Sequence, residues 1–155
     1  MTPAIRLLET LGIEYQVYSY HHNRATESYG AEAVAKLGLS AEVVFKTIIV
    51  TNEIKQLVTL LLPVDEKLDF KKVSKVISAK KVELADPKVV QRITGYVLGG
   101  VSPLGHKRRL VTVINESALS HSRIWVSAGK RGQEIALAPT DLASVLDAKF
   151  ADLVR

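Results

Sequence analysis

Cysteine is absent from this chain of 155 residues. The protein therefore cannot form a disulfide, use a cysteine nucleophile or bind a metal through thiolates. Its four histidines form no His-x-x-x-His or Glu-x-x-His pattern, and no Gly-x-Ser-x-Gly motif occurs. These absences argue against a zinc site and against a serine hydrolase of the nucleophile-elbow type. We expect no metal in this protein.

Aromatic residues and long apolar runs are also scarce. Aromatics make up 6% of the chain and do not form the closely spaced set of a general RNA-binding sheet. The longest apolar run, Leu57 to Val64, is interrupted by Thr59 and Pro63, whereas a membrane helix needs about 18 apolar residues. The N-terminus shows no basic region followed by an apolar stretch. We expect a cytoplasmic protein that does not enter a membrane.

The overall composition is that of an ordinary folded domain. Hydrophobic residues make up 47% and charged residues 24%, and 21 basic against 16 acidic residues give a net charge of +5. The length fits one domain over residues 1–155 with a core of useful size. The positive charge is compatible with a nucleic-acid partner and does not require one.

Periodicity predicts a mixture of helices and strands along the whole chain. Apolar residues at helical spacing, followed by glycine, predict helices over 4–11 and 26–37, the second capped by Thr26. Two β-branched runs at 43–51 and 56–63, joined by a polar turn, predict a hairpin. About six strands and five helices in mixed order predict a single α/β or α+β domain around a mixed sheet. The other expected helices are 69–79, 88–94 and from 140 towards 150, and the other expected strands are 13–20, 110–114, 123–127 and 133–137.

The segment from Gly99 to Lys107 is the most informative in the chain. Adjacent glycines at 99 and 100 allow a positive φ and let a ligand approach main-chain N–H groups closely. Pro103 then stiffens the loop, and a basic cluster, Lys107 to Arg109, follows. Such a loop suits a substrate that carries a carbonyl and a phosphate, although a tight turn between strands would share these features.

Two further segments could carry chemistry. Lys46 stands in an apolar strand between Phe45 and Thr47, so it either points to solvent or enters a cleft, where its ammonium would suit a phosphate or a polarised carbonyl. The run from Ser127 to Gly132 has small residues and two cations, which fit either a phosphate-contacting turn or an ordinary hairpin loop. Tyr20, which ends its strand, is a candidate for a cleft edge.

Taken in order, these segments resemble the YbaK/EbsC family. The resemblance rests on Phe45-Lys46-Thr47, Gly99 to Gly105, Ser127 to Gly132, the opening Met1 to Ala4 and the segment Ala138 to Leu142, and it covers essentially the whole chain. The family includes free-standing aminoacyl-tRNA deacylases and the editing domain inserted in many bacterial prolyl-tRNA synthetases. It implies a mixed, mostly antiparallel sheet or barrel of six or seven strands surrounded by helices, without a metal or organic cofactor.

The resemblance also implies which residues form the site. The essential lysine of the family falls on Lys46, its glycine loop on Gly99 to Pro103, its small-residue loop on Ser127 and Gly129, and its cleft tyrosine on Tyr20. Glu134 takes the place of an acidic residue found in some relatives. We therefore expect Lys46, Gly99, Gly100 and Val101 to be catalytic, and Tyr20, Thr47, Ser102, Pro103, Ser127, Gly129 and Glu134 to bind substrate.

The activity implied is clearance of mischarged Cys-tRNA(Pro), with Cys-tRNA(Cys) as a second substrate, in trans and beside a transiently bound prolyl-tRNA synthetase. An aminoacyl ester is already activated, so positioning and oxyanion stabilisation by N–H groups around Gly99 to Val101 would suffice. Because this chain has no cysteine, the hypothesis is that the thiol of the substrate attacks its own ester and leaves as a cyclic thiolactone. The alternatives are an Ala-tRNA(Pro) deacylase that uses water and a non-catalytic tRNA- or nucleotide-binding module.

Lysines and arginines outside the site fit an RNA substrate. Such residues could meet the phosphates of the acceptor stem without reading sequence, although each could equally be a solvated surface charge. The residues in question are Lys71, Lys72, Lys75, Lys80, Lys81, Lys107, Arg108 and Arg109.

Overall fold

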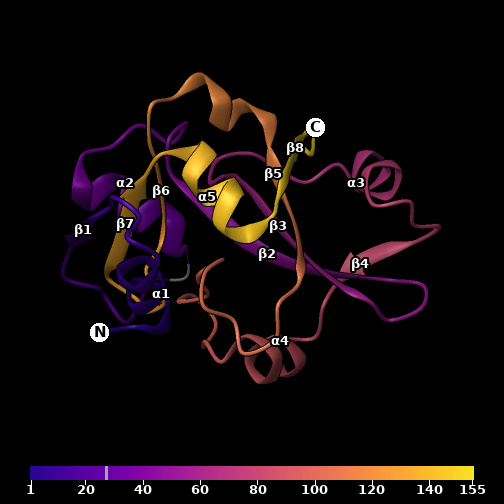
Figure 1. Ribbon diagram of the computed structural model, residues 1–155, viewed down its shortest axis with the longest axis horizontal. Coiled ribbons are helices and arrows are strands. Elements are labelled where there is room, and N and C mark those ends of the chain that lie inside the picture. Colours follow the sequence, from indigo (N-terminus) through magenta and orange to yellow (C-terminus); the bar gives the residue numbers. More distant parts are fainter. Residues whose placement is uncertain (27) are drawn as a thin grey trace.

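Two β-sheets form the centre of the protein (Figure 1). The computed structural model describes residues 1–26 and 28–155. The smaller sheet has the strand order β1-β7-β6 and the larger sheet the order β4-β2-β3-β5-β8. The strands of the smaller sheet are β1 (Gln16–Ser19), β6 (Ile124–Ser127) and β7 (Gln133–Leu137), and those of the larger sheet are β2 (Phe45–Asn52), β3 (Leu57–Pro63), β4 (Val82–Leu84), β5 (Val111–Asn115) and β8 (Lys149–Ala151).

The strand pairing confirms a mixed, mostly antiparallel α/β fold. Among the described strands, β3–β5 and β5–β8 pair in parallel, and the other strand ladders are antiparallel. The described residues form eight strands in two sheets that do not close into a barrel, which corrects the expectation of six or seven strands. The additional strands β4 and β8 have three residues each. Such short edge strands are too brief to show a period-2 pattern and are specified by the neighbours they pair with.

Five α-helices lie in the described ranges, as the sequence predicts. Gly12 and Gly38 end the first two with left-handed φ values of 68° and 64°, the geometry that favours glycine at this position. Asp69 and Asp86 cap the starts of the third and fourth through their side chains. The helices are α1 (Pro3–Leu11), α2 (Tyr29–Leu37), α3 (Phe70–Val76), α4 (Pro87–Thr94) and α5 (Pro139–Leu146), with a short 3-10 helix η1 (Glu116–Ser120).

Two helix ends differ from the prediction. The cap position of α2 is Ser28 rather than Thr26, because the Thr26 hydroxyl donates instead to Oε2 of Glu32 at 3.1 Å. The helix expected to run from 140 towards 150 ends at Leu146, where Asp147 takes a left-handed φ of 52°. The following residues then add β8 to the edge of the larger sheet.

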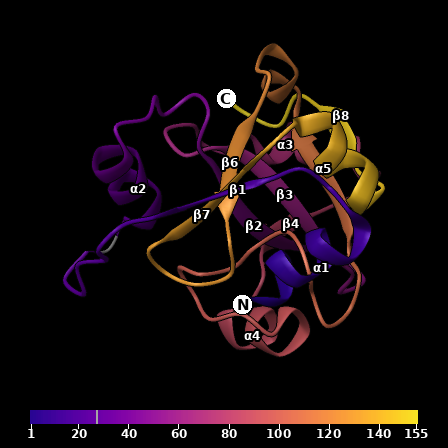
Figure 2. The ribbon, with the colours of Figure 1, turned by 60° about the vertical axis from the view of Figure 1, so that its left-hand side comes forward.

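Three apolar clusters fix the position of the two sheets. The largest joins α1 and α5 to both sheets, a second lies between the larger sheet and α3, and a third joins α2 to the smaller sheet. Figure 2 shows the smaller sheet with α2 on one side and α1 and α5 on the other. Within the described residues, no helix combines the length and the apolar character needed to cross a membrane.

Candidate functional site

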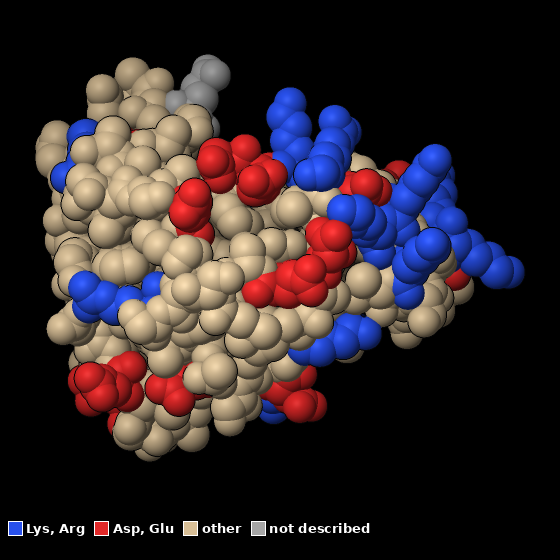
Figure 3. Space-filling view, turned by 90° about the horizontal axis from the view of Figure 1, so that it is seen from above, with Lys and Arg blue, Asp and Glu red and all other residues tan. Residues whose placement is uncertain are grey.

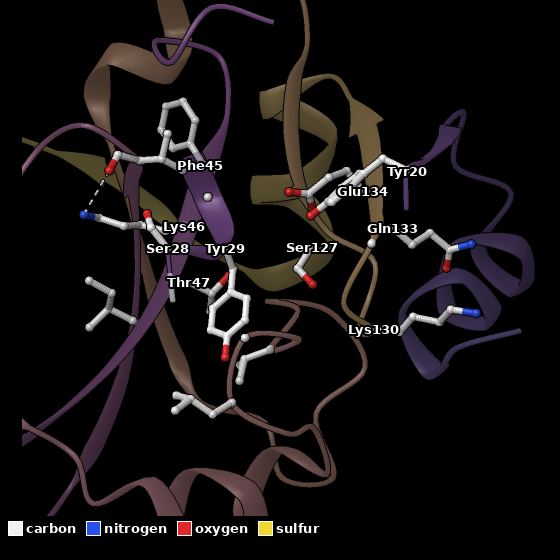
Figure 4. A pocket seen from close by; sticks show the side chains of 17 residues that line it. Tyr20, Ser28, Tyr29, Phe45, Lys46, Thr47, Ser127, Lys130, Gln133 and Glu134 are labelled. Carbon is white, nitrogen blue, oxygen red and sulfur yellow. Dashed lines mark hydrogen bonds between the residues drawn. The ribbon is translucent and has the colours of Figure 1, made fainter. Parts of the chain in front are cut away.

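A cavity of about 300 Å³ lies where the two sheets meet. Val44, directly before β2, and Trp125 of β6 pair in parallel as an isolated bridge, so no ladder holds together the residues that follow on the two strands. In Figure 4, Lys46 and Thr47 of β2 lie on one wall of the cavity, and Ser127 and Glu134 of the β6–β7 hairpin lie on the facing wall.

The structure brings together seven of the residues that the sequence predicts for the site. They come from five separate segments, which only the fold makes neighbours. The seven that line the cavity are Tyr20, Lys46, Thr47, Gly99, Val101, Ser127 and Glu134.

The other residues that line the cavity are not among the site residues that the sequence predicts. Tyr29 and Gly30 are among them because α2 begins beside the cavity, and no local motif marks that position. Lys130 and Gly132 lie in the segment that the sequence analysis singled out, and the hairpin geometry gives them the lining role. The remaining lining residues are Ser28, Phe45, Ile48, Val64, Leu98 and Gln133.

Lys46 lies in the wall of the cavity in a half-buried position. Its Nζ donates to the carbonyl oxygens of Glu66 at 2.7 Å and Val64 at 3.3 Å, so it ties β2 to the residues that follow β3. Burial lowers the pKa of Lys46, and nearby Asp65 and Glu66 oppose this effect. The carbonyls accept hydrogen bonds but do not neutralise the ammonium, so a positive charge remains at the cavity.

Glu134 is the most unusual group of the site. It shares a face of β7 with Ala136, which packs in the α2 cluster, while Ile135 and Leu137 point into the main core. Its Oε2 and the hydroxyl of Thr47 are buried without a hydrogen-bond partner among the described residues. Burial raises the pKa of Glu134 to about 8. At neutral pH the carboxyl group is therefore mostly protonated and can donate a hydrogen bond.

The glycine loop reaches the cavity at Gly99 and Val101. Gly99 has a φ of 83°, and a Cβ atom there would lie 2.6 Å from the ring of Tyr29, so both backbone and packing require glycine. The N–H of Gly100 donates to the carbonyl of Val97 at 2.9 Å and is used by the turn itself. Of the three predicted backbone donors, Gly99 and Val101 therefore remain at the cavity wall.

Three other predicted residues lie behind this wall. Ser102 is buried, its hydroxyl accepts a hydrogen bond from the N–H of Leu104 at 3.2 Å, and its carbonyl oxygen lies 2.6 Å from Nε2 of His106. Pro103 is buried beside it. Gly129 has a φ of 102°, and a Cβ atom there would lie 2.5 Å from the ring of Tyr96. Together with Gly100, these residues shape the loops and do not line the cavity.

Arg131 of the β6–β7 hairpin holds the glycine loop in place. The guanidinium of Arg131 donates to the carbonyl of Leu98 from Nε at 3.0 Å and from Nη2 at 2.5 Å. It also lies 5.0 Å from the centre of the Tyr29 ring, within the range of a cation–π contact. This arrangement links the hairpin, the glycine loop and α2 around the mouth of the cavity.

Glu32 fixes the segment that leads from Tyr20 to α2. Its carboxylate contacts Nδ1 of His22 at 2.6 Å and accepts from the N–H of Asn23 at 2.8 Å and the hydroxyl of Thr26 at 3.1 Å. Burial alone would raise the pKa of Glu32, but these hydrogen bonds lower it to about 2. Burial and the nearby Glu134 and Glu32 raise the pKa of Tyr20 to about 12, so its phenol is neutral and can donate at physiological pH.

The side chains that commonly bind metal ions are scattered over the described residues. Among residues 1–26 and 28–155, no three His, Asp or Glu side chains come together in a group that could hold a metal ion. The side chains that line the cavity supply two ammoniums, one carboxyl, one amide and several hydroxyls. The fold and this cavity define a mixed α/β domain with a polar cavity between its two sheets.

Comparison with known proteins places the domain in a family. The family described as "Aminoacyl-tRNA editing domain" matches residues 24–145. A protein of Enterococcus faecalis named "Putative Cys-tRNA(Pro)/Cys-tRNA(Cys) deacylase EbsC" is 36% identical over 153 residues, which cover 98% of this chain and 92% of that protein. The chain therefore belongs to the aminoacyl-tRNA editing domain family, as its motifs predict.

Two further matches cover most of the chain. The Bacillus subtilis protein YwhH is 26% identical over 130 residues, which cover 84% of this chain and 80% of that protein. A solved structure described as "Crystal structure of a putative trans-editing enzyme for prolyl tRNA synthetase" superimposes with a TM-score of 0.84 at 24% identity, covering 100% of this chain and 99% of that one. That likeness confirms the fold.

Proposed function

We propose that this protein is a trans-editing deacylase that clears cysteine from mischarged tRNA(Pro), with Cys-tRNA(Cys) as a second substrate. Membership of the editing family supports the reaction class, and the name of the Enterococcus relative supports the identity of the amino acid and tRNA. The whole described chain then acts as one editing domain. The reaction belongs in the cytoplasm, where a prolyl-tRNA synthetase that binds transiently would supply the mischarged tRNA.

One observation carries the proposal: polar side chains from both sheets line one cavity. Lys46 and Thr47 lie on one wall, and Ser127 and Glu134 lie on the facing wall (Figure 4). Oγ1 of Thr47 and Oε2 of Glu134 are buried in these walls without a partner among the described residues, and such a group costs about 1–3 kcal/mol. The aminoacyl end of a tRNA offers an amino group, an ester and ribose hydroxyls as partners for this polar lining.

In the proposed reaction, the glycine loop stabilises the developing oxyanion. Gly99 and Val101 line the cavity, and backbone N–H donors held in a rigid loop there would need no reorganisation during the reaction. The ammonium of Lys46 supports the ester carbonyl or the terminal phosphate electrostatically. Ser127 and Tyr20 complete the lining as hydrogen-bonding groups that orient the substrate.

Among the described residues that line the cavity, none is a strong nucleophile, so we assign this role to the substrate. The sulfur of the cysteinyl thiol attacks its own ester carbonyl carbon, the C–S bond forms, and the bond from that carbon to the ribose oxygen breaks. The thiol proton ends on the ribose oxygen, and the products are a cyclic thiolactone and free tRNA. The hydroxyl of Ser127 accepts a hydrogen bond from the N–H of Gly129 at 3.1 Å, and no histidine lines the cavity beside it.

The second candidate is a deacylase for Ala-tRNA(Pro) that uses water. Such an enzyme needs a pocket that excludes side chains larger than a methyl group. The cavity of about 300 Å³ must hold the terminal ribose and the ester as well as the amino acid. The preference for cysteine in our proposal rests on the name of the Enterococcus relative.

Deacylation of Cys-, Ala- and Pro-tRNA(Pro) by wild type and Lys46→Ala, with identification of the products, tests the proposal. Lys88→Ala is a matched control, because Lys88 is exposed on α4. We expect Lys46-dependent loss of cysteine as a thiolactone, and much slower release of serine from the serine-charged tRNA. Equal rates for cysteine and serine would exclude thiol assistance, release of alanine alone would favour the water-dependent enzyme, and no turnover would favour a binding module.

A further inference from the structure

A second groove, of about 380 Å³, lies at the other end of β2 from the cavity. It is formed by the end of β2, the start of β3, the end of α3 and the segments that contain Arg108–Val111 and Lys149. Three cations line it, namely Arg108, Arg109 and Lys149, and none of its lining residues is acidic. Gln56 and Ser78 add neutral hydrogen-bond donors.

The positive charge of this groove is not neutralised by ion pairs within the described residues. Nζ of Lys149 donates to the carbonyl of Val76 at 2.8 Å, and Nη2 of Arg109 donates to the carbonyl of Val145 at 3.3 Å. These bonds orient the two cations and leave their charge intact. The side chain of Arg108 makes no hydrogen bond to the described part of the protein and is exposed.

The groove is continuous with a basic end of the molecule. Figure 3 shows lysine and arginine side chains gathered around the end that carries α3 and β4. Lys75, Lys80 and Lys81 are exposed on or near these elements. Lys72 differs from them, because its Nζ lies 2.8 Å from Oδ2 of Asp152, and it is therefore partly neutralised.

We propose that this groove, together with Lys75, Lys80 and Lys81, binds the phosphodiester backbone of an RNA duplex. The duplex would be the stem of the RNA whose aminoacyl end occupies the cavity, so the inference rests on the proposed function. Arginine presents a planar fork that matches phosphate oxygens. Aromatic side chains, which would stack on bases, are absent from the lining. The surface therefore suits contacts with the phosphate backbone of the RNA, which do not depend on the nucleotide sequence.

The separation of groove and cavity fits a stem rather than a single nucleotide. Lys46 lines the cavity, and Asn52, six residues further along β2, lines the groove. A strand rises about 3.3 Å per residue, so these two residues are about 20 Å apart along β2, and Ile48, which also lines the cavity, is about 13 Å from Asn52. The unpaired 3′ end of a tRNA would cross this distance, and the stem that follows it would lie at the groove. A terminal trinucleotide fills the cavity but has no stem to occupy the groove.

Binding of an uncharged, fluorescently labelled RNA hairpin at several salt concentrations tests the inference directly. The double variant Arg108→Gln/Lys75→Gln removes two exposed charges whose side chains make no hydrogen bond to the described chain. Arg6→Gln removes one exposed charge from α1 and serves as the control. We expect at least a tenfold loss of affinity in the double variant, and a log–log salt slope that falls by about 0.7–0.9 for each lost phosphate contact. The control should match wild type.

A kinetic comparison separates the groove from the catalytic site. For deacylation of full-length aminoacyl-tRNA, the double variant should show a raised KM, whereas for a short aminoacylated trinucleotide its KM and kcat should equal those of wild type. Wild-type affinity and salt slope in the double variant would overturn the inference, as would a wild-type protein that does not bind the hairpin. RNA binding that depends on the groove, in a protein that deacylates no substrate, would retain the groove and reject the proposed deacylase.

Discussion

The buried carboxyl of Glu134 makes the stability of this protein depend on pH in an unusual direction. Burial raises its pKa from 4.5 to about 8 in the folded protein, while in the unfolded chain the group returns to its ordinary value. The folded state therefore holds this proton more tightly than the unfolded state. The contribution of Glu134 to the free energy of unfolding is therefore greatest below pH 4.5. This contribution falls as the pH rises towards 8 and the carboxyl group ionises.

The size of the effect follows from the same pKa values. Each tenfold change in proton affinity is worth about 1.4 kcal/mol. A rise from 4.5 to about 8 therefore corresponds to about 5 kcal/mol once the pH exceeds 8, and to about 3 kcal/mol at pH 7. This is a large part of the roughly 5–15 kcal/mol that stabilises a typical domain.

Substitution of Glu134 by glutamine removes the ionisation and keeps the shape of the side chain. Urea unfolding of wild type and Glu134→Gln at intervals from pH 4.5 to 9 measures the difference. We expect the two proteins to have similar stability at pH 4.5, and the variant to become more stable by about 3 kcal/mol at pH 7. Direct titration of the side-chain carboxyl by NMR provides an independent value of the pKa. Parallel stability curves would refute the reasoning, since they would mean that Glu134 ionises as readily in the folded protein as in the unfolded chain.

Two further substitutions test the packing around the cavity. In Gly99→Ala the backbone has φ 83° and the new Cβ would lie 2.6 Å from the ring of Tyr29, whereas in Gly38→Ala the backbone has φ 64° and nothing lies within 4 Å. In both variants the left-handed backbone should lower the free energy of unfolding by about 1–2 kcal/mol, and only Gly99→Ala should show a larger loss in urea unfolding. Equal losses in the two variants would show that the contact with Tyr29 is unimportant. In Glu32→Gln, removal of a carboxylate whose pKa is lowered to about 2 should destabilise the protein above pH 4.5. That difference should shrink as pH falls towards 2, and a difference that does not change with pH would contradict the role of the charge.

Much of the fold can be predicted from local patterns. The hairpin of β2 and β3, the helix that ends before Gly12 and the helix that ends before Gly38 all depend on neighbours in sequence. The sequence therefore predicts these elements correctly. The strands β4 and β8 could not be predicted, because they are specified by edge pairing with strands far away in the chain. The end of α5 could not be predicted because Asp147, and not a glycine, takes the left-handed conformation there.

In the candidate site, too, some residues can be predicted from local motifs and others cannot. Motifs indicate Lys46, Gly99 and Ser127 because unusual residues stand together in each segment. The lining by Tyr29 follows from the position of α2, and the displacement of Ser102 from the cavity follows from its burial behind the loop. Neither position has a local sequence signal, so neither could be found without the structure.

The sequence by itself determined the class of fold, the family and the segments that carry the site, because each is encoded in the order and type of nearby residues. The tertiary structure decided what those residues face. It buried Glu134 and the hydroxyl of Thr47 on facing walls of one cavity, bonded the ammonium of Lys46 to two backbone carbonyls, and gathered Arg108 and Lys149 into one groove. Burial and approach between distant segments set pKa values and hydrogen-bond partners, and these depend on how the two sheets pack.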